Sequence, residues 1–289
     1  MTKTSATYKL LDSGNFRKLE KVGSYLLDRP APQAIWKPGR SVDIWKKADA
    51  FYERSSSGSG SWKYRNKIPE SWFISYHGLV IKVKLTDFGH LGLFPEHASV
   101  WEWIRDKISG ASCPVKLLNV FAYTGGASLA GASAGAEVTH LDAAKGIVSW
   151  ARENAEASGL TGKPIRWIVD DAAKFISREI RRHNKYDALI LDPPSYGRGS
   201  RGEVWKFESE ISNLLNLCGR ILADKPLFVI LSAHTPGFSA IALANLLADT
   251  MRGYKGKLTC GDMTVCEEIS DRRLPSGIIA KWEARCFQK

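Results

Sequence analysis

Acidic residues stand directly after apolar runs in the second half of the chain. Asp142 ends the stretch EVTHLD, Asp170 and Asp171 end IRWIVDD, and Asp192 ends YDALILD. Carboxylates accept hydrogen bonds from hydroxyl and amino groups, and open α/β sheets bind ligands beyond the carboxyl ends of their strands. The pattern therefore predicts a nucleoside-like ligand at one edge of a sheet. Each acid can instead serve a turn or cap a helix, and Asp171 before AAKF is the clearest such case.

A glycine turn precedes these acids. The run VKLLNVFAY (115–123) is typical of a short buried strand, and it is followed by Thr124, Gly125 and Gly126. Glycine lets the backbone approach a ligand closely and leaves the N-terminus of the next helix open. Together with the acids, this turn makes a set of strand ends that can surround one ligand.

The elements that must position these residues alternate along the chain. Apolar runs at 137–143, 165–171, 186–192 and 226–233 are separated by stretches with helical spacing of apolar residues. Such alternation predicts an α/β fold with a parallel sheet covered on both faces. The final segments KLTCGDMTVCEE (257–268) and LPSGIIAKWEAR (274–285) have no long helix between them, so they are expected to close the sheet as an antiparallel pair.

The glycine turn distinguishes between nucleotide cofactors. NAD-binding folds use GxGxxG and P-loops use GxxxxGK[ST], whereas the turn here is AYTGGAS and matches neither. An adenosyl cofactor without phosphates needs less of a phosphate cradle. The turn therefore favours S-adenosylmethionine (SAM).

With these residues, the chain resembles class I SAM-dependent methyltransferases, and within them the bacterial 23S large-subunit ribosomal RNA methyltransferases that modify cytosine C5 or guanine. The similar segments are LNVFAYTGGASLAGASAGAEVTHLDAAKGIVSWARENAEASGL, DDAAKF and YDALILDPPSYG. The segment HLGLFPEH (90–97) resembles a family segment that folds over the cofactor, although it ends in Pro-Glu-His where the family has Leu-Asp-Gln-Arg. The resemblance implies a Rossmann-like domain with a mostly parallel seven-stranded sheet and helices on both faces. It also implies that the family's N-terminal RNA-binding module, a small PUA β-barrel, is shortened or missing here.

The resemblance also implies roles for single residues. The turn of residues 121–125 would hold the methionine part of SAM, Asp142 the ribose hydroxyls, and Asp171 the adenine amine. Asp192 would face both the cofactor's ammonium group and the target base. The predicted cofactor-binding set is Phe94, Phe121, Tyr123, Thr124, Gly125, Asp142, Ala143, Asp170, Asp171 and Asp192.

The segments after the fourth and fifth strands indicate the type of methyl transfer. Methylation of cytosine C5 requires a cysteine thiolate that adds at C6, and neither DPPSYG nor SAHTPG contains a cysteine. Cys218, Cys260 and Cys266 are expected to be buried structural residues. Transfer to a base nitrogen needs only an in-line approach of the nitrogen to the methyl group.

The predicted catalytic residues are Asp192, Pro193, Pro194 and Tyr196. Asp192 can accept a hydrogen bond from a base N–H, the prolines present carbonyls from a stiff backbone, and Tyr196 can stack on an extruded base. The sequence thus predicts methylation of a guanine or adenine nitrogen in RNA, with ribosomal RNA favoured. The alternatives are a DNA N6-adenine methyltransferase and a non-catalytic SAM-fold protein that binds RNA or assists assembly.

Charge supports a polyanionic partner. The formal net charge is +11 and the isoelectric point is about 9.4, which favours nucleic acid, although a basic surface without such a partner is the alternative. Arg198 and Arg201, in GRGSRGEVWK, are predicted to contact the phosphate backbone. His234, after the fifth strand, either approaches the substrate as a general base or is structural.

The remaining features divide the chain and indicate a compartment. Residues 1–112 are predicted to form a strand-rich substrate-binding region, with a hairpin in 72–85, and residues 113–289 the SAM-binding domain. No apolar run is long enough for a membrane helix, and the N-terminus lacks an apolar signal region. Five scattered cysteines predict neither disulfides nor a metal site and fit the reducing cytoplasm. The oligomeric state is not indicated.

Overall fold

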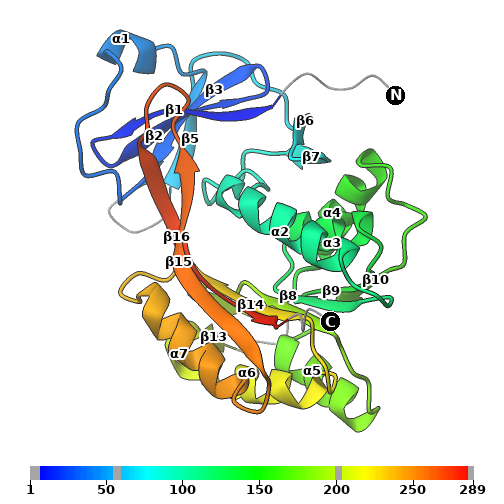
Figure 1. The fold of residues 1–289 in the computed structure, drawn as a ribbon. Coiled ribbons are helices and arrows are strands. Elements are labelled where there is room, and N and C mark those ends of the chain that lie inside the picture. The colour runs from blue at the N-terminus through cyan, green and yellow to red at the C-terminus, as the bar shows by residue number, and fades with distance from the viewer. Residues whose placement is uncertain (1–6, 55–59, 199–203, 286–289) are drawn as a thin grey trace. The chain divides into compact units, whose positions relative to one another are not determined.

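The computed structural model describes residues 7–54, 60–198 and 204–285, and the chain divides into two compact units (Figure 1). The N-terminal unit comprises Met1–Ala98 and Thr264–Ser276, and the α/β unit comprises Ser99–Met263 and Gly277–Lys289. The division therefore falls earlier than the predicted boundary at residue 112. In addition, the tip of a late hairpin groups with the N-terminal unit.

The α/β unit is built on a seven-stranded sheet with the order β10-β9-β8-β11-β14-β16-β15. Its strands are β8 (Lys116–Val120), β9 (Glu137–Asp142), β10 (Ile165–Val169), β11 (Ala188–Leu191), β14 (Phe228–Ala233), β15 (Gly256–Cys266) and β16 (Arg273–Ala284). The pairs β9/β10, β8/β9, β8/β11 and β11/β14 are parallel, and β16 is antiparallel to β14. The predicted fold class is confirmed. The order reverses between β8 and β11, where a ligand crevice is expected.

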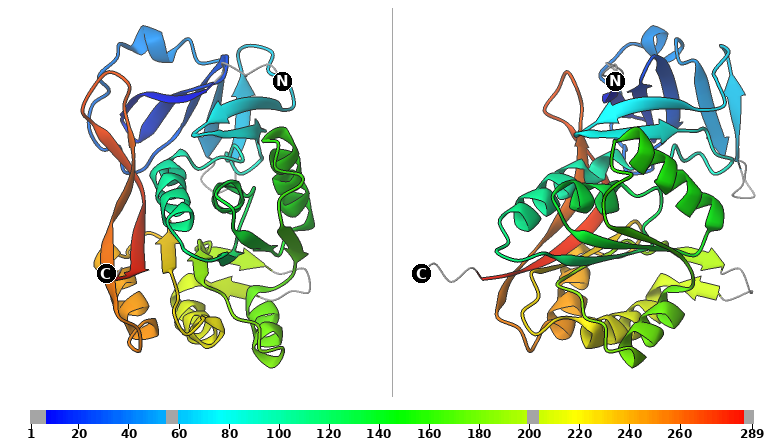
Figure 2. Two further views of the ribbon diagram at one scale, coloured as in Figure 1. Left: turned by 45° about the vertical axis from the view of Figure 1, so that its right-hand side comes forward. Right: turned by 90° about the vertical axis from the view of Figure 1, so that its right-hand side faces the viewer.

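Helices cover both faces of this sheet (Figure 2). One face carries α2 (Ala98–Ser109), α3 (Gly126–Ser133) and α4 (Lys145–Ala157); the other carries α5 (Ala172–Arg181), α6 (Phe207–Ile221) and α7 (Ala240–Thr250). Within the described residues, no helix is both long enough and apolar enough to span a membrane.

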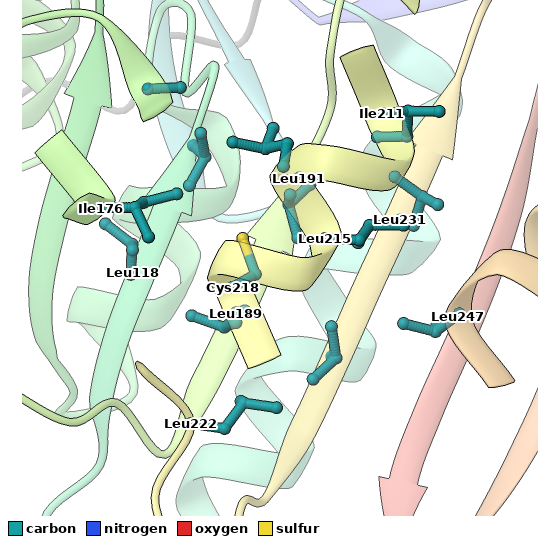
Figure 3. Close-up of a cluster of buried hydrophobic side chains, with 14 of the residues drawn as sticks. Leu118, Ile176, Leu189, Leu191, Ile211, Leu215, Cys218, Leu222, Leu231 and Leu247 are labelled. Atoms are coloured by element: carbon teal, nitrogen blue, oxygen red, sulfur yellow. The ribbon is translucent and has the colours of Figure 1, made fainter. Parts of the chain in front are cut away.

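The core under α6 shows why the helical spacing was readable. Its apolar residues recur at intervals of three and four, so they form one stripe against the sheet. Figure 3 shows Ile211, Leu215 and Cys218 facing Leu189 and Leu191 of β11. Burial raises the pKa of the Cys218 thiol to about 12, which confirms a structural cysteine. Cys260 and Cys266 were also predicted to be buried, and this was wrong: both are exposed, on β15 near the edge of the sheet.

The helix α2 explains the shifted boundary. Val100, Ile104 and Ile108 pack with Leu117 of β8 in one apolar cluster, so the residues before 113 help to cover the sheet. Trp101 of the same helix lies against the start of α3, where a Cβ atom added to Gly126 would stand 2.2 Å from the indole Cζ2. The sequence around Trp101 gave no strand or glycine signal that would place it here.

Substitution of Gly126 by alanine is expected to destabilise the α/β unit by about 1–3 kcal/mol, because the buried Trp101 ring must move. Gly146→Ala is the matched control: Gly146 lies in the first turn of α4 with no atom within 4 Å of an added Cβ. It should stabilise by about 0.5–1 kcal/mol. Urea unfolding measures both, and equal effects would contradict the packing assigned to Trp101.

The N-terminal unit contains a five-stranded sheet in the order β1-β2-β3-β4-β5 and a separate β6–β7 hairpin. Its elements are β1 (Tyr8–Gly14), β2 (Arg17–Val22), β3 (Tyr25–Pro30), α1 (Val42–Trp45), β4 (Ala50–Arg54), β5 (Gly60–Tyr64), β6 (Trp72–Tyr76), β7 (Leu79–Val83) and the 3-10 turn η1 (Pro95–His97). The hairpin predicted in 72–85 is confirmed. Its turn places His77 and Gly78 at φ values of 44° and 78°, as a two-residue hairpin turn requires.

A buried charge cluster holds β1, β2 and β3 together. Arg29 donates to both oxygens of Glu20, at 2.6 and 2.8 Å, and the Tyr8 hydroxyl donates to the same carboxylate at 2.8 Å. Burial alone would raise the pKa of Glu20, but the charges of Arg29 and Lys18 and these hydrogen bonds outweigh it. They lower the pKa to about 2 from 4.5.

Glu20 is therefore expected to stabilise the N-terminal unit only while it is charged. Because its pKa is lower in the folded state, its contribution is fully present above about pH 4.5 and is lost as the pH falls toward 2. Glu20→Gln should cost about 3–5 kcal/mol at pH 7, since Arg29 stays buried without its partner. Urea unfolding should show this cost shrinking by about 2 kcal/mol at pH 3.

Glu268→Gln is the control, because the Glu268–Lys9 ion pair is solvent-exposed and its loss should change the free energy of unfolding by less than about 1 kcal/mol. A cost of Glu20→Gln that is the same at pH 7 and pH 3 would contradict the role given to its charge.

Candidate functional site

The carboxyl ends of five strands meet at one edge of the α/β unit. Since β8, β9, β10, β11 and β14 are parallel neighbours, the residues that follow each of them lie on the same edge of the sheet. The predicted residues 121–125, Asp142, Asp170, Asp171 and Asp192 are all among these. Phe94 belongs to the N-terminal unit, where its ring contacts His90 and His97 with centroid distances of 5.7 and 6.3 Å. Its part in cofactor binding stays a prediction.

The turn after β8 has an unusual backbone. Phe121, Tyr123 and Gly125 all have positive φ values, of 57°, 49° and 93°. The left-handed region costs energy for residues other than glycine, and such strain gathers at functional sites. Gly125 is the N-cap of α3, and a Cβ atom there would lie 3.2 Å from Cβ of Ala151. Gly125 thus takes a left-handed conformation that favours glycine where the chain enters α3, and the close approach of a ligand to this turn stays a prediction.

Hydrogen bonds of buried side chains support this turn from the protein interior. The Asn154 amide donates to the Thr124 carbonyl at 2.8 Å, and both residues are buried. Ser128 links Asn119 to His140 Nδ1, each at 2.9 Å. Burial, with the nearby Arg152 charge, lowers the pKa of His140 to about 3, so the imidazole is neutral. None of these supports was predicted, because nothing in the local sequence marks a polar residue that packs beneath a turn.

Asn154→Ala should loosen the turn by leaving the Thr124 carbonyl buried without this donor. The expected loss is about 1–3 kcal/mol of unfolding free energy. Binding of S-adenosylhomocysteine, the demethylated form of the predicted cofactor, should weaken about tenfold in calorimetry, in proportion to that loss. Glu156→Ala, an exposed change on the same helix, is the control. Unchanged affinity in a less stable protein would restrict Asn154 to a folding role.

Asp142 is held at the end of β9 by the turn itself. Its Oδ2 accepts the Tyr123 N–H and its Oδ1 the Ala144 N–H, both at 3.0 Å. Burial raises the pKa of this carboxyl, although the N–H groups of Ala144, Tyr123 and Ala143 act in the opposite direction. Ala143 is exposed beside it. The carboxylate therefore has a fixed orientation, with further lone pairs that can accept ribose hydroxyls.

The two acids after β10 have local partners. Asp171 is the N-cap of α5 and accepts the Lys174 N–H at 2.9 Å, so the capping interpretation is confirmed. Asp170 forms an ion pair with Arg178 of the same helix and accepts the Asp171 N–H at 2.9 Å. Contact of either acid with adenine stays a prediction.

Asp192 is joined to the end of the neighbouring strand β14. Its Oδ1 accepts the Ser232 hydroxyl at 2.6 Å and lies 3.7 Å from His234 Nε2. The Thr235 hydroxyl donates to Ser195 Oγ at 2.9 Å. Two loops that are 40 residues apart in the chain are thus connected at several points. The polar run SAHT was the available signal for Ser232 and Thr235.

The prolines and Tyr196 form the outer part of the turn. The Pro194 carbonyl accepts the Trp205 indole N–H at 2.7 Å, so it is already engaged by the protein. Trp205 lies on β13 (Val204–Lys206), which pairs with β12 (Tyr196–Arg198), and its ring is 5.0 Å from that of Phe121. Tyr196 is 51% exposed and Pro193 is buried. Trp205, which the sequence did not single out, therefore connects this turn to the turn at residues 121–125.

Two arginines, Arg198 and Arg201, were predicted to bind phosphates. The Arg198 backbone is in β12, and nothing is described of its side chain. Arg201 lies outside the described residues.

A cavity of about 450 Å³ lies at the opposite, amino edge of the sheet, lined by Lys116, Glu137 and Tyr186 among others. Its polar groups bind one another: Glu179 accepts hydrogen bonds from Tyr186 at 2.7 Å and from Asn184 at 2.9 Å. It is separate from the strand ends described above and contains none of the predicted site residues.

Comparison with known proteins places this geometry in a family. A family model for S-adenosylmethionine-dependent methyltransferases matches residues 49–224. The crystal structure of the SAM-dependent methyltransferase from Agrobacterium tumefaciens is 40% identical, with a TM-score of 0.92, and the match covers 97% of this chain and 92% of that one. SMU.776, solved in complex with SAH, shares the fold at 20% identity and a TM-score of 0.72, covering 97% of this chain and 76% of that one.

The match to curated relatives covers a smaller share of each relative's length. Ribosomal RNA large subunit methyltransferase K/L is 31% identical in Colwellia psychrerythraea and 33% in Hahella chejuensis, over 50% and 52% of this chain. This chain spans about a fifth of the length of these relatives. On the family match and the close structural relative, the chain belongs to the S-adenosylmethionine-dependent methyltransferases and is an enzyme with SAM as its cofactor.

Proposed function

We propose that this enzyme methylates a base nitrogen of ribosomal RNA by direct in-line transfer, without a covalent bond between enzyme and base. The observation that carries the proposal is the Asp192 carboxylate, oriented by Ser232 beside the DPPSY turn. Neither DPPSYG after β11 nor SAHTPG at the end of β14 contains a cysteine. The half-chain similarity to ribosomal RNA large subunit methyltransferases K/L supports ribosomal RNA as the substrate.

The residues at the strand ends fit SAM. The positive-φ turn with Gly125 provides a close approach for the methionine part, and the oriented Asp142 carboxylate suits two vicinal ribose hydroxyls. Ala143, Asp170 and Asp171 are placed along the adjacent edge, and Phe94 remains a further proposed contact. When bound, the cofactor supplies an electrophilic methyl group on a positively charged sulfur.

The acceptor side fits a base nitrogen better than a carbon. Asp192 can accept a hydrogen bond from a base N–H, and the exposed ring of Tyr196 offers a stacking surface. Of the two proline carbonyls proposed to face the base, that of Pro194 already accepts the Trp205 indole N–H, which leaves that of Pro193 as the proposed acceptor. Cys218, the cysteine of α6, is fully buried and its raised pKa keeps it a thiol. Neither DPPSYG nor SAHTPG contains a cysteine, so these two segments offer no thiolate for covalent addition to cytosine C6.

The proposed RNA binding rests on charge and on two arginines. The net charge of +11 favours a polyanion, and Arg198 and Arg201 are proposed to contact phosphates beside the turn. The exposed thiols of Cys113, Cys260 and Cys266 support a reducing compartment, the cytoplasm.

Mass spectrometry of ribosomal RNA nucleosides from a deletion strain and its parent tests the proposal. We expect one methylated purine nucleoside to disappear and to return when the intact gene is supplied, but not with an Asp142→Ala version. Loss of 5-methylcytosine would contradict direct transfer to nitrogen. Loss of N6-methyladenine from DNA would favour the DNA alternative. An unchanged profile with tight SAM binding would favour a non-catalytic RNA-binding or assembly factor.

A further inference from the structure

We propose that His234 is a further catalytic residue, whose Nε2 takes the proton that an exocyclic amino group of the target base loses on methylation. The inference rests on the proposed function and narrows its substrate to an acceptor nitrogen that carries hydrogen. It also assigns Ser232 and Gly277 as positioning residues, since neither would contact the base.

His234 and Asp192 are separated by a distance that suits one shared hydrogen-bond donor. The Nε2 and Oδ1 atoms are 3.7 Å apart, too far for a hydrogen bond between them. They are close enough for one amino nitrogen to lie within hydrogen-bonding distance of both. An amino group has two hydrogens, so it can donate one to the carboxylate and direct the other to the imidazole. A ring nitrogen without hydrogen would leave both groups unused.

Asp192 and His234 both lie in segments that hydrogen bonds and strand pairing hold in place. The Ser232 hydroxyl donates to Asp192 Oδ1 at 2.6 Å, and Thr235 donates to Ser195 across the same two loops. His234 follows directly on β14, whose last pair with β16 is Ala233 with Ile278. His234 therefore lies between a paired strand and hydrogen-bonded residues, so its backbone position is more restricted than that of a histidine in a solvated loop.

Gly277 explains how the imidazole is oriented. A Cβ atom added to Gly277 would stand 2.9 Å from His234 Nδ1 and 3.0 Å from Cε1. The ring therefore lies against the backbone of β16. The added Cβ would also stand 2.6 Å from the Met263 methyl carbon, so a larger residue at position 277 would crowd both the imidazole and Met263. With Nδ1 toward β16, Nε2 is the nitrogen near Asp192.

The proton balance is simple. The acceptor nitrogen forms the new N–C bond with its lone pair, while the carbon–sulfur bond of the methyl donor breaks and sulfur keeps that pair. The N–H bond then breaks, nitrogen keeps its electrons, and the proton binds the lone pair of Nε2. The resulting imidazolium lies beside the Asp192 carboxylate, which stabilises its charge.

The test uses the full chain, labelled SAM and an unmodified transcript of large-subunit ribosomal RNA. His234→Gln keeps a hydrogen-bonding amide near Nε2 but cannot take up a proton; His234→Ala removes both. We expect single-turnover rates at least about 100-fold lower in both variants. The affinity for S-adenosylhomocysteine, measured by calorimetry, should change less than about twofold. Added imidazole should restore part of the rate of His234→Ala and none of that of His234→Gln.

Two further variants separate catalysis from folding. Gly277→Ala keeps the imidazole but displaces it, so it should lower the rate without preventing folding. His183→Gln, an exposed histidine at the end of α5, should have no effect. Product analysis should show a methylated exocyclic amine.

A His234→Gln enzyme with the full rate, or 7-methylguanosine as the product, would overturn the inference while leaving the proposed function intact. A wild-type enzyme that methylates no RNA would overturn both.

Discussion

Asp142→Asn should weaken binding of S-adenosylhomocysteine by about 100-fold, or about 3 kcal/mol. Both oxygens of Asp142 accept backbone N–H groups, from Tyr123 and Ala144. An asparagine amide has only one oxygen, so its NH₂ group must face one of these donors. The substitution therefore disturbs the turn at residues 121–125 and also removes the carboxylate that is proposed to accept the ribose hydroxyls. Calorimetry measures the affinity directly and requires no RNA.

The control is Glu137→Gln, an exposed change at the amino end of the same strand, which should leave the affinity unchanged. The pH dependence gives a second readout. Because burial raises the pKa of Asp142, it is protonated at a higher pH than an ordinary aspartate of pKa 3.8. Affinity should therefore begin to fall above that pH on acidification, and this component should be absent in Asp142→Asn. An affinity that Asp142→Asn leaves intact would move the ribose site elsewhere.

Asp192→Asn should lower the rate of methyl transfer by about 100- to 1,000-fold. Asparagine can still accept the Ser232 hydroxyl, so the local fold should be retained, but the carboxylate proposed to face the acceptor is lost. The affinity for S-adenosylhomocysteine should fall less than the rate, because Asp142 and the glycine turn remain. Single-turnover methylation with labelled SAM measures the rate.

Ser232→Ala is the companion variant. It keeps the Asp192 charge but removes the 2.6 Å hydrogen bond that orients it, so a smaller loss of about tenfold is expected. If Asp192→Asn retained the full rate, the acceptor site would lie elsewhere on the sheet edge, and the proposed transfer to a base nitrogen would lose its main support.

The architecture was readable from the sequence because its signals are local. Buried parallel strands are short apolar runs, and the helices between them repeat their apolar residues every three or four positions. The acids and glycines after these runs had to fall on one edge once the strands were parallel. The turn at 121–125 and the location of Asp142 and Asp192 followed from this without any tertiary contact.

What the tertiary structure decided depends on which strands are neighbours. Only the adjacency of β11 and β14 brings Ser232, His234 and Thr235 to the Asp192 turn, from 40 residues further along the chain. Trp205, Asn154 and Trp101 likewise act through packing partners far from them in sequence.

For other residues, the structural neighbours altered the interpretation that the sequence had suggested. Asp171 is occupied by its own helix and Asp170 by Arg178, while Cys260 and Cys266 are exposed near the sheet edge. A residue type and its spacing thus determined which groups reach the edge of the sheet. Neighbouring groups already form hydrogen bonds or ion pairs with some of these residues, and this decides which of them can still contact a cofactor or a base. Those neighbours come together only in the folded chain.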